Sequence, residues 1–255
     1  MPKSIINTRN PKDADVVIVS APCDISGSFR KGTAEGPKKV IECLNTQIEF
    51  FDRRYKIEST EYIKIAHTEI KGLNKMTPAQ AHNRVVDVCD DTKSELVFLI
   101  GGEHSMSFGA LKSLAKKHNP KDVTIFQIDA HCDLRLDDSD YNDTNPTEYA
   151  HSAVMRRAHE MGYNLVQVGI RAYSKDEHDY FTKHKNITVF EWGNNYKGDT
   201  FIAPKIETIL KSIKTKKVYI SIDVDGFDPG FMPWTGTPVS GGLEWYYGLK
   251  LLEKV

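Results

Sequence analysis

The chain has 255 residues, of which 40% are hydrophobic and 27% charged, so it can bury one sizeable core in a single domain, residues 1–255. Its formal net charge is -1, and the absence of a basic surplus argues against nucleic acid or an anionic membrane surface as a partner. Neither a bilayer-spanning apolar run of roughly 20 residues nor a signal-peptide core is present, which predicts a soluble, cytoplasmic protein.

Short apolar runs rich in β-branched residues recur along the chain and predict buried strands. In chain order they cover residues 16–20, 63–66, 96–100, 123–128, 165–168, 187–190 and 218–222. Segments with helical spacing lie between most of these runs. They predict helices at residues 77–93, 108–117, 151–161, 175–185 and 203–214, the first with Thr77 as N-cap and Pro78 at its first position.

Strands that alternate with helices need crossover connections, which produce a parallel sheet covered by helices on both faces. Several of the predicted strands are almost wholly apolar, as expected when both faces of the sheet are buried. The sequence therefore predicts the α/β class. Residues 136–149 are polar, acidic and turn-rich, which predicts a long surface loop.

The four cysteines, Cys23, Cys43, Cys89 and Cys132, form neither a CxxC pair nor a dense framework. This pattern is typical of reduced thiols in a cytosolic protein. We expect Cys23 and Cys132 to be small buried hydrophobes.

A polar cluster begins where each of three predicted strands ends. Residues 96–100 lead into GGEHS (101–105), residues 123–128 into DAHCD (129–133), and residues 218–222 into DVDG (223–226). Because the carboxyl ends of parallel strands share one edge of the sheet, where ligands bind, these clusters can converge. The candidate site residues are His104, Asp129, His131, Asp133, Asp223 and Asp225.

The residue types of these clusters predict a metal centre. Residues two apart in an extended segment point the same way, so the members of each cluster can face one pocket. Four aspartates in one site cannot all stay ionised without cations, because like charges raise one another's pKa, and two divalent ions would neutralise them. Carboxylate and imidazole ligands without thiolate suit Mn²⁺ better than a sulfur-rich zinc site. We therefore expect two manganese ions per chain.

Each cluster taken alone has a plainer interpretation. An aspartate after a strand is usually a helix cap or a solvated loop residue, and the two glycines before His104 can simply form a turn. Their joint position after three separate strands favours the metal centre.

Five segments resemble the signatures of the ureohydrolases, the family of arginase and agmatinase, and the resemblance covers nearly the whole chain. They are APCDISGSFRKGTAEGP (21–37), GGEHSMSFG (101–109), DAHCDLR (129–135), HSAVMRR (151–157) and SIDVDGFDPGFMPWTGTPVSGGL (221–243). The last is highly specific, and DAHCDLR with HSAVMRR looks more like the agmatinase branch than like arginase. The resemblance implies a three-layer fold around a mostly parallel sheet of about eight strands, and assembly into trimers or hexamers.

The resemblance also implies a role for each candidate. His104 and Asp133 would bind one manganese ion, His131 and Asp225 the other, and Asp129 and Asp223 would bridge both.

The implied reaction is hydrolysis of a guanidino substrate, such as agmatine to putrescine and urea. A water held by both ions would attack the guanidinium carbon, and Asp133 would accept its hydrogen. His151 resembles the family's proton-shuttling histidine and would protonate the departing amine. Without the family, a histidine at a helix start is more often a cap or a surface residue.

Substrate choice is open at this stage. The acidic loop, with Asp137, Asp138, Asp140, Asp143 and Glu148, could attract the distal ammonium of agmatine or be merely solvated. Arg135 stands where arginases have a small polar residue, which argues against arginine as substrate. It also leaves open an acidic substrate such as guanidinobutyrate or formiminoglutamate.

The chain departs from the family pattern near its end. The family usually carries a glutamate that meets the guanidinium, and here Glu244 comes three residues early while Tyr247 takes the expected place. Either Glu244 binds substrate instead or this contact is lost. The chain also stops at Val255, which suggests truncation or an unusually short member. Both features leave a catalytically silent family member as a rival interpretation.

Overall fold

The computed structural model describes residues 4–255, which divide into two compact units. The first unit comprises residues 4–27 and 31–113, and the second comprises residues 28–30 and 114–255. Whether the chain behaves as a single domain remains a prediction. Among the described residues, no helix is long and apolar enough to cross a membrane.

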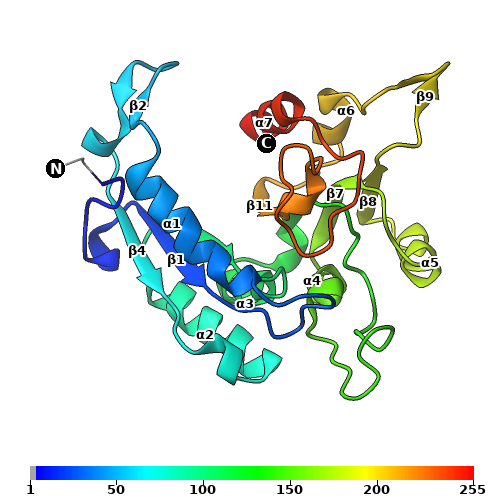
Figure 1. Cartoon of the computed structure of the whole chain (residues 1–255), viewed down its shortest axis with the longest axis horizontal. Coiled ribbons are helices and arrows are strands. Elements are labelled where there is room, and N and C mark those ends of the chain that lie inside the picture. The colour runs from blue at the N-terminus through cyan, green and yellow to red at the C-terminus, as the bar shows by residue number, and fades with distance from the viewer. Residues whose placement is uncertain (1–3) are drawn as a thin grey trace. The chain divides into compact units, whose positions relative to one another are not determined.

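The first unit is built on a parallel sheet of three strands (Figure 1). Their order is β4 (Ile65–Glu69), β1 (Val16–Ala21) and β5 (Leu96–Gly101). Figure 1 shows α1 (Gly36–Thr46) and α2 (Pro78–Asp91) on opposite sides of this sheet. The unit also contains the short hairpin of β2 (Phe51–Asp52) and β3 (Ile57–Glu58), and most of α3 (Met106–Lys117).

Helix α2 begins as its sequence predicts. Thr77 caps it in a capping box, in which its hydroxyl accepts from the Gln80 N–H while the Gln80 side chain accepts from the Thr77 N–H. Pro78 occupies the first turn, where a missing N–H costs nothing.

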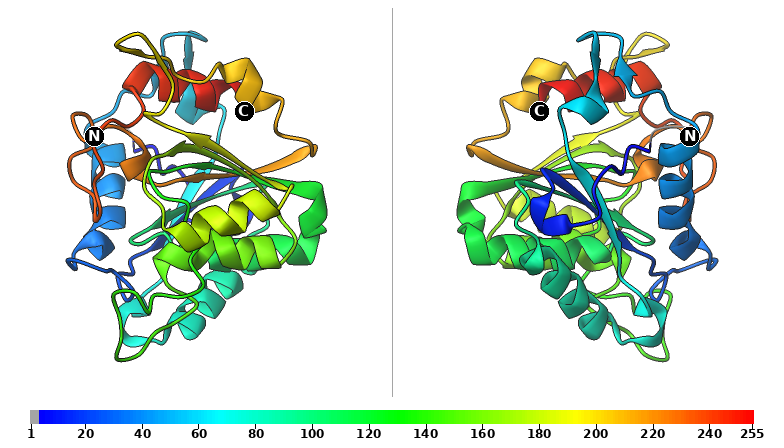
Figure 2. Two further views of the ribbon diagram at one scale, coloured as in Figure 1. Left: turned by 90° about the vertical axis from the view of Figure 1, so that its right-hand side faces the viewer. Right: turned by 90° about the vertical axis from the view of Figure 1, so that its left-hand side faces the viewer.

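The second unit is built on a parallel sheet of four strands. Their order is β11 (Lys217–Ile222), β6 (Val123–Ile128), β7 (Asn164–Ile170) and β8 (Ile187–Glu191). Figure 2 shows α4 (Val154–Glu160) and α5 (Lys175–Lys183) on one face, with α6 (Ile206–Leu210) and α7 (Trp245–Lys254) on the other. A short hairpin of β9 (Tyr196–Lys197) and β10 (Thr200–Phe201) precedes α6. Two helical layers around a parallel sheet confirm the predicted α/β class.

All seven predicted strands are present and parallel, but they belong to two sheets, one in each unit. The predicted helix at 203–214 contracts to α6, because Pro204 disfavours the helical conformation of Ala203 and the N-cap Lys205 is extended. Sequence reasoning missed α1 and both hairpins. Helix α1 has apolar residues at helical spacing, Val40, Ile41 and Leu44, but it buries only Pro37.

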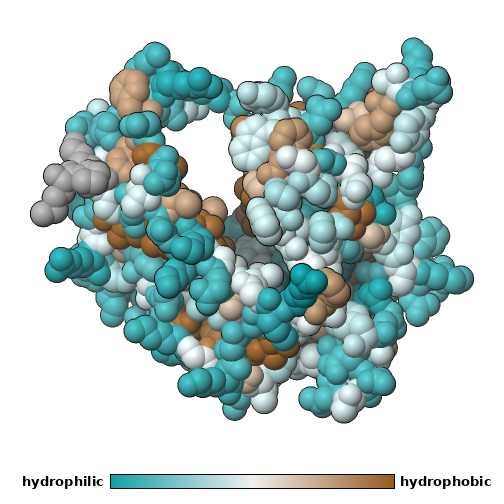
Figure 3. All heavy atoms as spheres, viewed as in Figure 1, coloured by the Kyte–Doolittle hydropathy of each residue, from teal (hydrophilic) through white to brown (hydrophobic). Residues whose placement is uncertain are grey.

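The strands differ in burial more than their composition predicts. Every residue of β6 is buried, whereas β5 and β11 are the last strands of their sheets and leave apolar side chains exposed. Leu96 and Phe98 are each 54% exposed, and Ile220 is 44% exposed. In the view of Figure 3, hydrophilic residues cover most of the surface while hydrophobic ones show in several places. The prediction that every apolar run is buried is therefore wrong for these two edge strands.

Candidate metal centre

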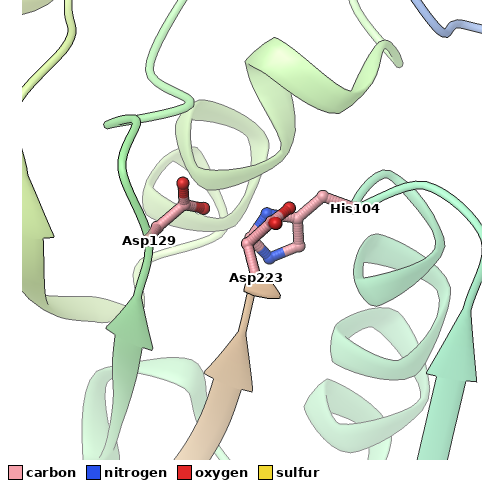
Figure 4. A group of neighbouring side chains, drawn as sticks. All are labelled: His104, Asp129 and Asp223. Atoms are coloured by element: carbon pink, nitrogen blue, oxygen red, sulfur yellow. The ribbon is translucent and has the colours of Figure 1, made fainter. Parts of the chain in front are cut away.

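The second unit brings two of the three polar clusters together at one sheet edge. Strands β6 and β11 pair in register up to Ile128 and Ile222, so Asp129 and Asp223 leave the sheet side by side. The Asp223 N–H donates to the Ile128 carbonyl at 2.9 Å. A carboxylate oxygen of Asp223 lies within 4.8 Å of one of Asp129. Figure 4 shows both aspartates at the carboxyl ends of their strands.

A tight turn after β11 returns Asp225 to β6. Asp223 is the N-cap of a 3-10 turn (Val224–Gly226), and its carboxylate accepts from the Asp225 N–H at 3.1 Å. Asp225 in turn accepts from the Ala130 N–H at 3.0 Å. Gly226 permits this approach, because a Cβ there would lie 2.6 Å from the Asp129 nitrogen. Asp223 is therefore both a cap and a member of the cluster.

Asp129, His131 and Asp225 form a compact group whose potential ligand atoms all lie within 4.8 Å of one another. His131 Nδ1 is 3.1 Å from an Asp225 oxygen and 3.7 Å from an Asp129 oxygen. Asp129 and Asp225 are 1% and 3% exposed, while the His131 side chain is 28% exposed. Asp129 is thus close to Asp223 on one side and to the His131 and Asp225 pair on the other.

The electrostatics of this group call for a cation. Burial raises the pKa of Asp225, and the negative charge of Asp129 raises it further. Burial alone lowers the pKa of His131, but hydrogen bonds and charge from Asp129 and Asp225 outweigh burial and raise it to about 11. Two buried carboxylates side by side need positive charge, and the donor set of carboxylate oxygens and imidazole nitrogen, without thiolate, fits a divalent metal ion.

Asp133 has an unusual backbone conformation. Its φ of 51° lies in the left-handed region, which aspartate tolerates better than most residues. The conformation turns its carbonyl toward the start of α4, where it accepts from the Met155 and Arg156 N–H groups at 3.0 and 3.1 Å. Asp133 is buried but does not belong to the compact group of Asp129, His131 and Asp225.

His104 lies in the first unit, in the turn between β5 and α3, and is drawn with the two aspartates in Figure 4. Glu103 fixes this turn by accepting from the Ser26 N–H at 2.8 Å and from the Ser105 hydroxyl at 2.6 Å. Gly102 is required there, because a Cβ would lie 2.1 Å from the Cys23 carbonyl oxygen. Gly101 ends β5, Gly102 lies in a bend, and His104 lies in the turn that follows.

His151 opens a 3-10 turn (His151–Ala153) that leads into α4. Its ring centre is 5.8 Å from that of Tyr141, whose hydroxyl is 2.7 Å from the Ser152 hydroxyl. The Arg135 N–H donates to the Ser152 carbonyl at 3.1 Å. The segment that carries His151 is thus tied directly to the segment that follows Asp133.

The acidic side chains of the predicted surface loop are largely engaged within it. Asp138 is buried and accepts from the Asn142 amide at 3.0 Å, and Glu148 pairs with the guanidinium of Arg157. Asp140 pairs with Arg135, which also lies 4.0 Å from a Glu177 oxygen. The acidic groups of the loop are therefore paired within it and with the flanking Arg135 and Arg157, and Arg135 already has carboxylate partners.

The chain end places the two candidates for guanidinium contact in different surroundings. Glu244 is exposed at the N-cap of α7, directly after Leu243, which bridges to Phe227. Tyr247 is half-buried, packs on Trp192 with ring centres 5.2 Å apart, and donates its hydroxyl to the Pro204 carbonyl. Tyr247 is thus a packing residue in the core between the sheet and α7.

Sequence reasoning missed Arg171, which follows β7 directly. Its guanidinium donates to backbone carbonyls, among them those of Gly169 at 2.9 Å, Asp225 at 2.6 Å and Ser240 at 3.2 Å. It therefore clamps the turn that carries Asp225 to β7 and to the loop before α7. An arginine that immediately follows a buried strand was the available signal.

The cysteines match their predicted role. All four are free, and Cys23 and Cys132 are fully buried. Burial raises the pKa of Cys23 to about 12, with a further contribution from the charge of Glu103, so this thiol stays protonated and behaves as a small hydrophobe.

A parallel α/β fold with carboxylates and an imidazole gathered at the strand ends is an arrangement suited to the class of metal-centre enzymes. Comparison with known proteins narrows this class. A model of the Arginase family matches residues 14–255. The N(1)-aminopropylagmatine ureohydrolase of Synechocystis is 35% identical, over 95% of this chain and 77% of its own length. The agmatinase of Pyrococcus horikoshii is 32% identical, over 96% of this chain and 80% of its own length.

Structural comparison gives the same result. The agmatine ureohydrolase of Thermoplasma volcanium matches with a TM-score of 0.79 at 25% identity, over 100% of this chain and 82% of that chain. The chain therefore belongs to the arginase family. It is a hydrolase of that family, which confirms the sequence-based resemblance.

Proposed function

We propose that this protein is a manganese-dependent ureohydrolase that cleaves agmatine to putrescine and urea. The observation that carries the proposal is the group of Asp129, His131 and Asp225, whose donor atoms lie within 4.8 Å of one another in a chain of the arginase family. Such a group needs a cation, and an activated water is what hydrolysis of a guanidinium requires.

Two manganese ions would be held by six side chains. His104 and Asp133 would bind one ion, His131 and Asp225 the other, and Asp129 with Asp223 would bridge both. The proximity of Asp129 to both Asp223 and the His131 and Asp225 pair supports its bridging role. Oxygen and imidazole donors without thiolate support manganese over a structural zinc site.

When bound, the ions would acidify a water between them and hold it for attack on the guanidinium carbon. Asp133 would orient that water and accept its hydrogen, a task suited to a carboxylate whose backbone is fixed against α4. His151 would then protonate the departing amine nitrogen, because an imidazole exchanges protons near neutral pH. Glu244, exposed at the start of α7, would meet the cationic substrate.

Agmatine is a cationic substrate, and the pairing of Arg135 with Asp140 supports it over acidic ones. A guanidinobutyrate or formiminoglutamate carboxylate would need a free cation, whereas Arg135 already has carboxylate partners. N(1)-aminopropylagmatine is the second candidate, because the Synechocystis relative named for it is 35% identical to this chain.

The test is colorimetric urea release after loading the protein with Mn²⁺. Agmatine, N(1)-aminopropylagmatine, guanidinobutyrate and arginine would be compared as substrates at equal concentration, with the chelator-treated protein as control. We expect urea from one or both agmatine compounds and none from arginine. Absence of urea from every guanidino compound would identify a catalytically silent family member and overturn the proposal.

The assignment of His151 has its own test. His151→Asn should lower kcat by about 10²–10⁴-fold and leave KM nearly unchanged, because only proton transfer is lost. His178→Asn, at an exposed histidine of α5, is the matched control and should leave kcat unchanged. Equal kcat values for the His151 variant and the wild type would refute the proton-transfer role.

We further propose a cytoplasmic polyamine-forming enzyme that assembles into trimers or hexamers. Sedimentation analysis with and without Mn²⁺ tests the assembly, and a monomer under both conditions would contradict it.

A further inference from the structure

We propose that two buried glutamines, Gln127 and Gln167, form a relay that positions Asp129 as a metal ligand. The inference rests on the metal centre of the proposed function and goes beyond its ligands. Neither glutamine would touch the metal or the substrate, so both are positioning residues.

The two glutamines are unexpected in their strands. Gln127 interrupts the apolar run of β6 and Gln167 that of β7, and both are fully buried. They are partners in the parallel register of β6 and β7, so they lie side by side on one face of the sheet. Burial of an amide without hydrogen-bond partners costs free energy of folding, so two buried amides side by side indicate a function for their hydrogen bonds.

The amides form a directed chain of hydrogen bonds. The Gln167 amide donates to the Gln127 carbonyl oxygen and, at 2.7 Å, to the Cys132 backbone carbonyl. These two contacts set which end of each amide points where. The Gln127 amide nitrogen then donates to Asp129 Oδ2 at 2.6 Å. The chain therefore runs from the backbone after His131 to one specific oxygen of Asp129.

The second oxygen of Asp129 is fixed independently. Asp129 Oδ1 accepts from the His131 N–H at 2.7 Å. With one donor on each oxygen, the orientation of the Asp129 carboxylate is fixed, which is what a metal ligand requires.

The relay uses neutral donors, and this matters for the charge of the site. Lysine or arginine in place of Gln127 would neutralise Asp129 and weaken its attraction for a cation. An amide orients the carboxylate and leaves its full charge for the metal. Partners behind metal ligands act in this manner, and their loss typically lowers metal affinity about 10–100-fold.

The experiment compares Mn²⁺ affinity and stoichiometry by titration calorimetry of the metal-free full-length chain. Gln127→Leu removes the donor to Asp129 but also removes one of the two acceptors of the Gln167 amide. The double variant Gln127→Leu with Gln167→Leu removes both amides, so apolar packing restores stability while Asp129 remains unpositioned. We expect both to bind Mn²⁺ about 10–100-fold more weakly than the wild type, and the double variant to melt within a few degrees of it.

A matched control lies in the same strand. Thr124 is buried near the start of β6, and its hydroxyl is 2.7 Å from that of Thr215. Thr124→Val should lower thermal stability without changing Mn²⁺ affinity, because it disturbs β6 far from Asp129. Wild-type affinity in the double glutamine variant would overturn the relay, even with the metal centre intact. A wild type that binds no Mn²⁺ would overturn the proposed metal centre and the relay together.

Discussion

His131 Nδ1 lies 3.1 Å from a carboxylate oxygen of Asp225, although the two residues follow different strands and are distant in the sequence. The 3-10 turn after β11 makes this contact possible, because it brings Asp225 within hydrogen-bonding distance of Ala130, in the segment that follows β6. The pair is therefore produced by the register of two parallel strands.

Either member of this pair should be indispensable for metal binding. His131→Ala or Asp225→Ala should reduce bound manganese below two ions per chain and abolish urea release, because each removes a ligand of the same proposed ion. Elemental analysis after dialysis measures the stoichiometry. His178→Ala, at an exposed histidine, serves as control. Two manganese ions in both site variants would refute these ligand assignments.

A substitution at Asp133 can separate the role of its backbone from that of its side chain. Asn tolerates the left-handed φ of 51° and keeps the carbonyl contacts to α4, so Asp133→Asn should fold normally. It cannot accept the hydrogen of the attacking water, and kcat should fall by about 10²–10⁴-fold. Thermal melting and steady-state kinetics measure the two effects. A variant with normal kcat would show that the carboxylate has no part in the reaction.

Arg171 should be irreplaceable by lysine. A lysine keeps the charge but cannot reach the carbonyls of Gly169, Asp225 and Ser240 together. We expect Arg171→Lys to lower the free energy of unfolding by about 2–4 kcal/mol, because hydrogen bonds from a charged donor are lost. Urea-induced unfolding measures this change. Unchanged stability would mean that the loop before α7 is held by other contacts.

His82 should make the protein sensitive to acid. Burial lowers its pKa from 6.5 to about 4, and the positive charge of Lys112 contributes. The unfolded chain therefore takes up the proton first. The contribution of neutral His82 to the free energy of unfolding is fully present above pH 6.5. It decreases by about 1.4 kcal/mol per pH unit as the pH falls from 6.5 toward 4, which amounts to about 3 kcal/mol.

Replacement of His82 by glutamine tests this linkage. His82→Gln cannot titrate, so its free energy of unfolding should depend less steeply on pH between 6.5 and 4 than that of the wild type. His178→Gln, at an exposed site of the second unit, should retain the wild-type slope. Parallel pH profiles for wild type and the His82 variant would contradict the prediction. Denaturant unfolding at several pH values supplies the measurement.

The sequence by itself determined the strands, most helices and the candidate ligands, because these follow from local patterns. Apolar runs of β-branched residues predict strands wherever they lie, and Asp129 and Asp223 are recognisable as polar residues that end such runs. The DAHCDLR and DVDG motifs also indicated the family to which the chain belongs. The same local reasoning missed α1, although Val40, Ile41 and Leu44 lie at helical spacing there.

Only the tertiary structure decided how these residues act on one another. The left-handed backbone of Asp133, the carbonyl contacts of Arg171 and the amide chain from Gln167 to Asp129 depend on strand register and turn geometry. The exposure of β5 and β11 likewise depends on which strands pair, since an apolar run reads the same at the centre and at the edge of a sheet. The periodicity of a sequence shows which face of a helix or strand is apolar. The contacts that orient site residues form between elements that only folding brings together.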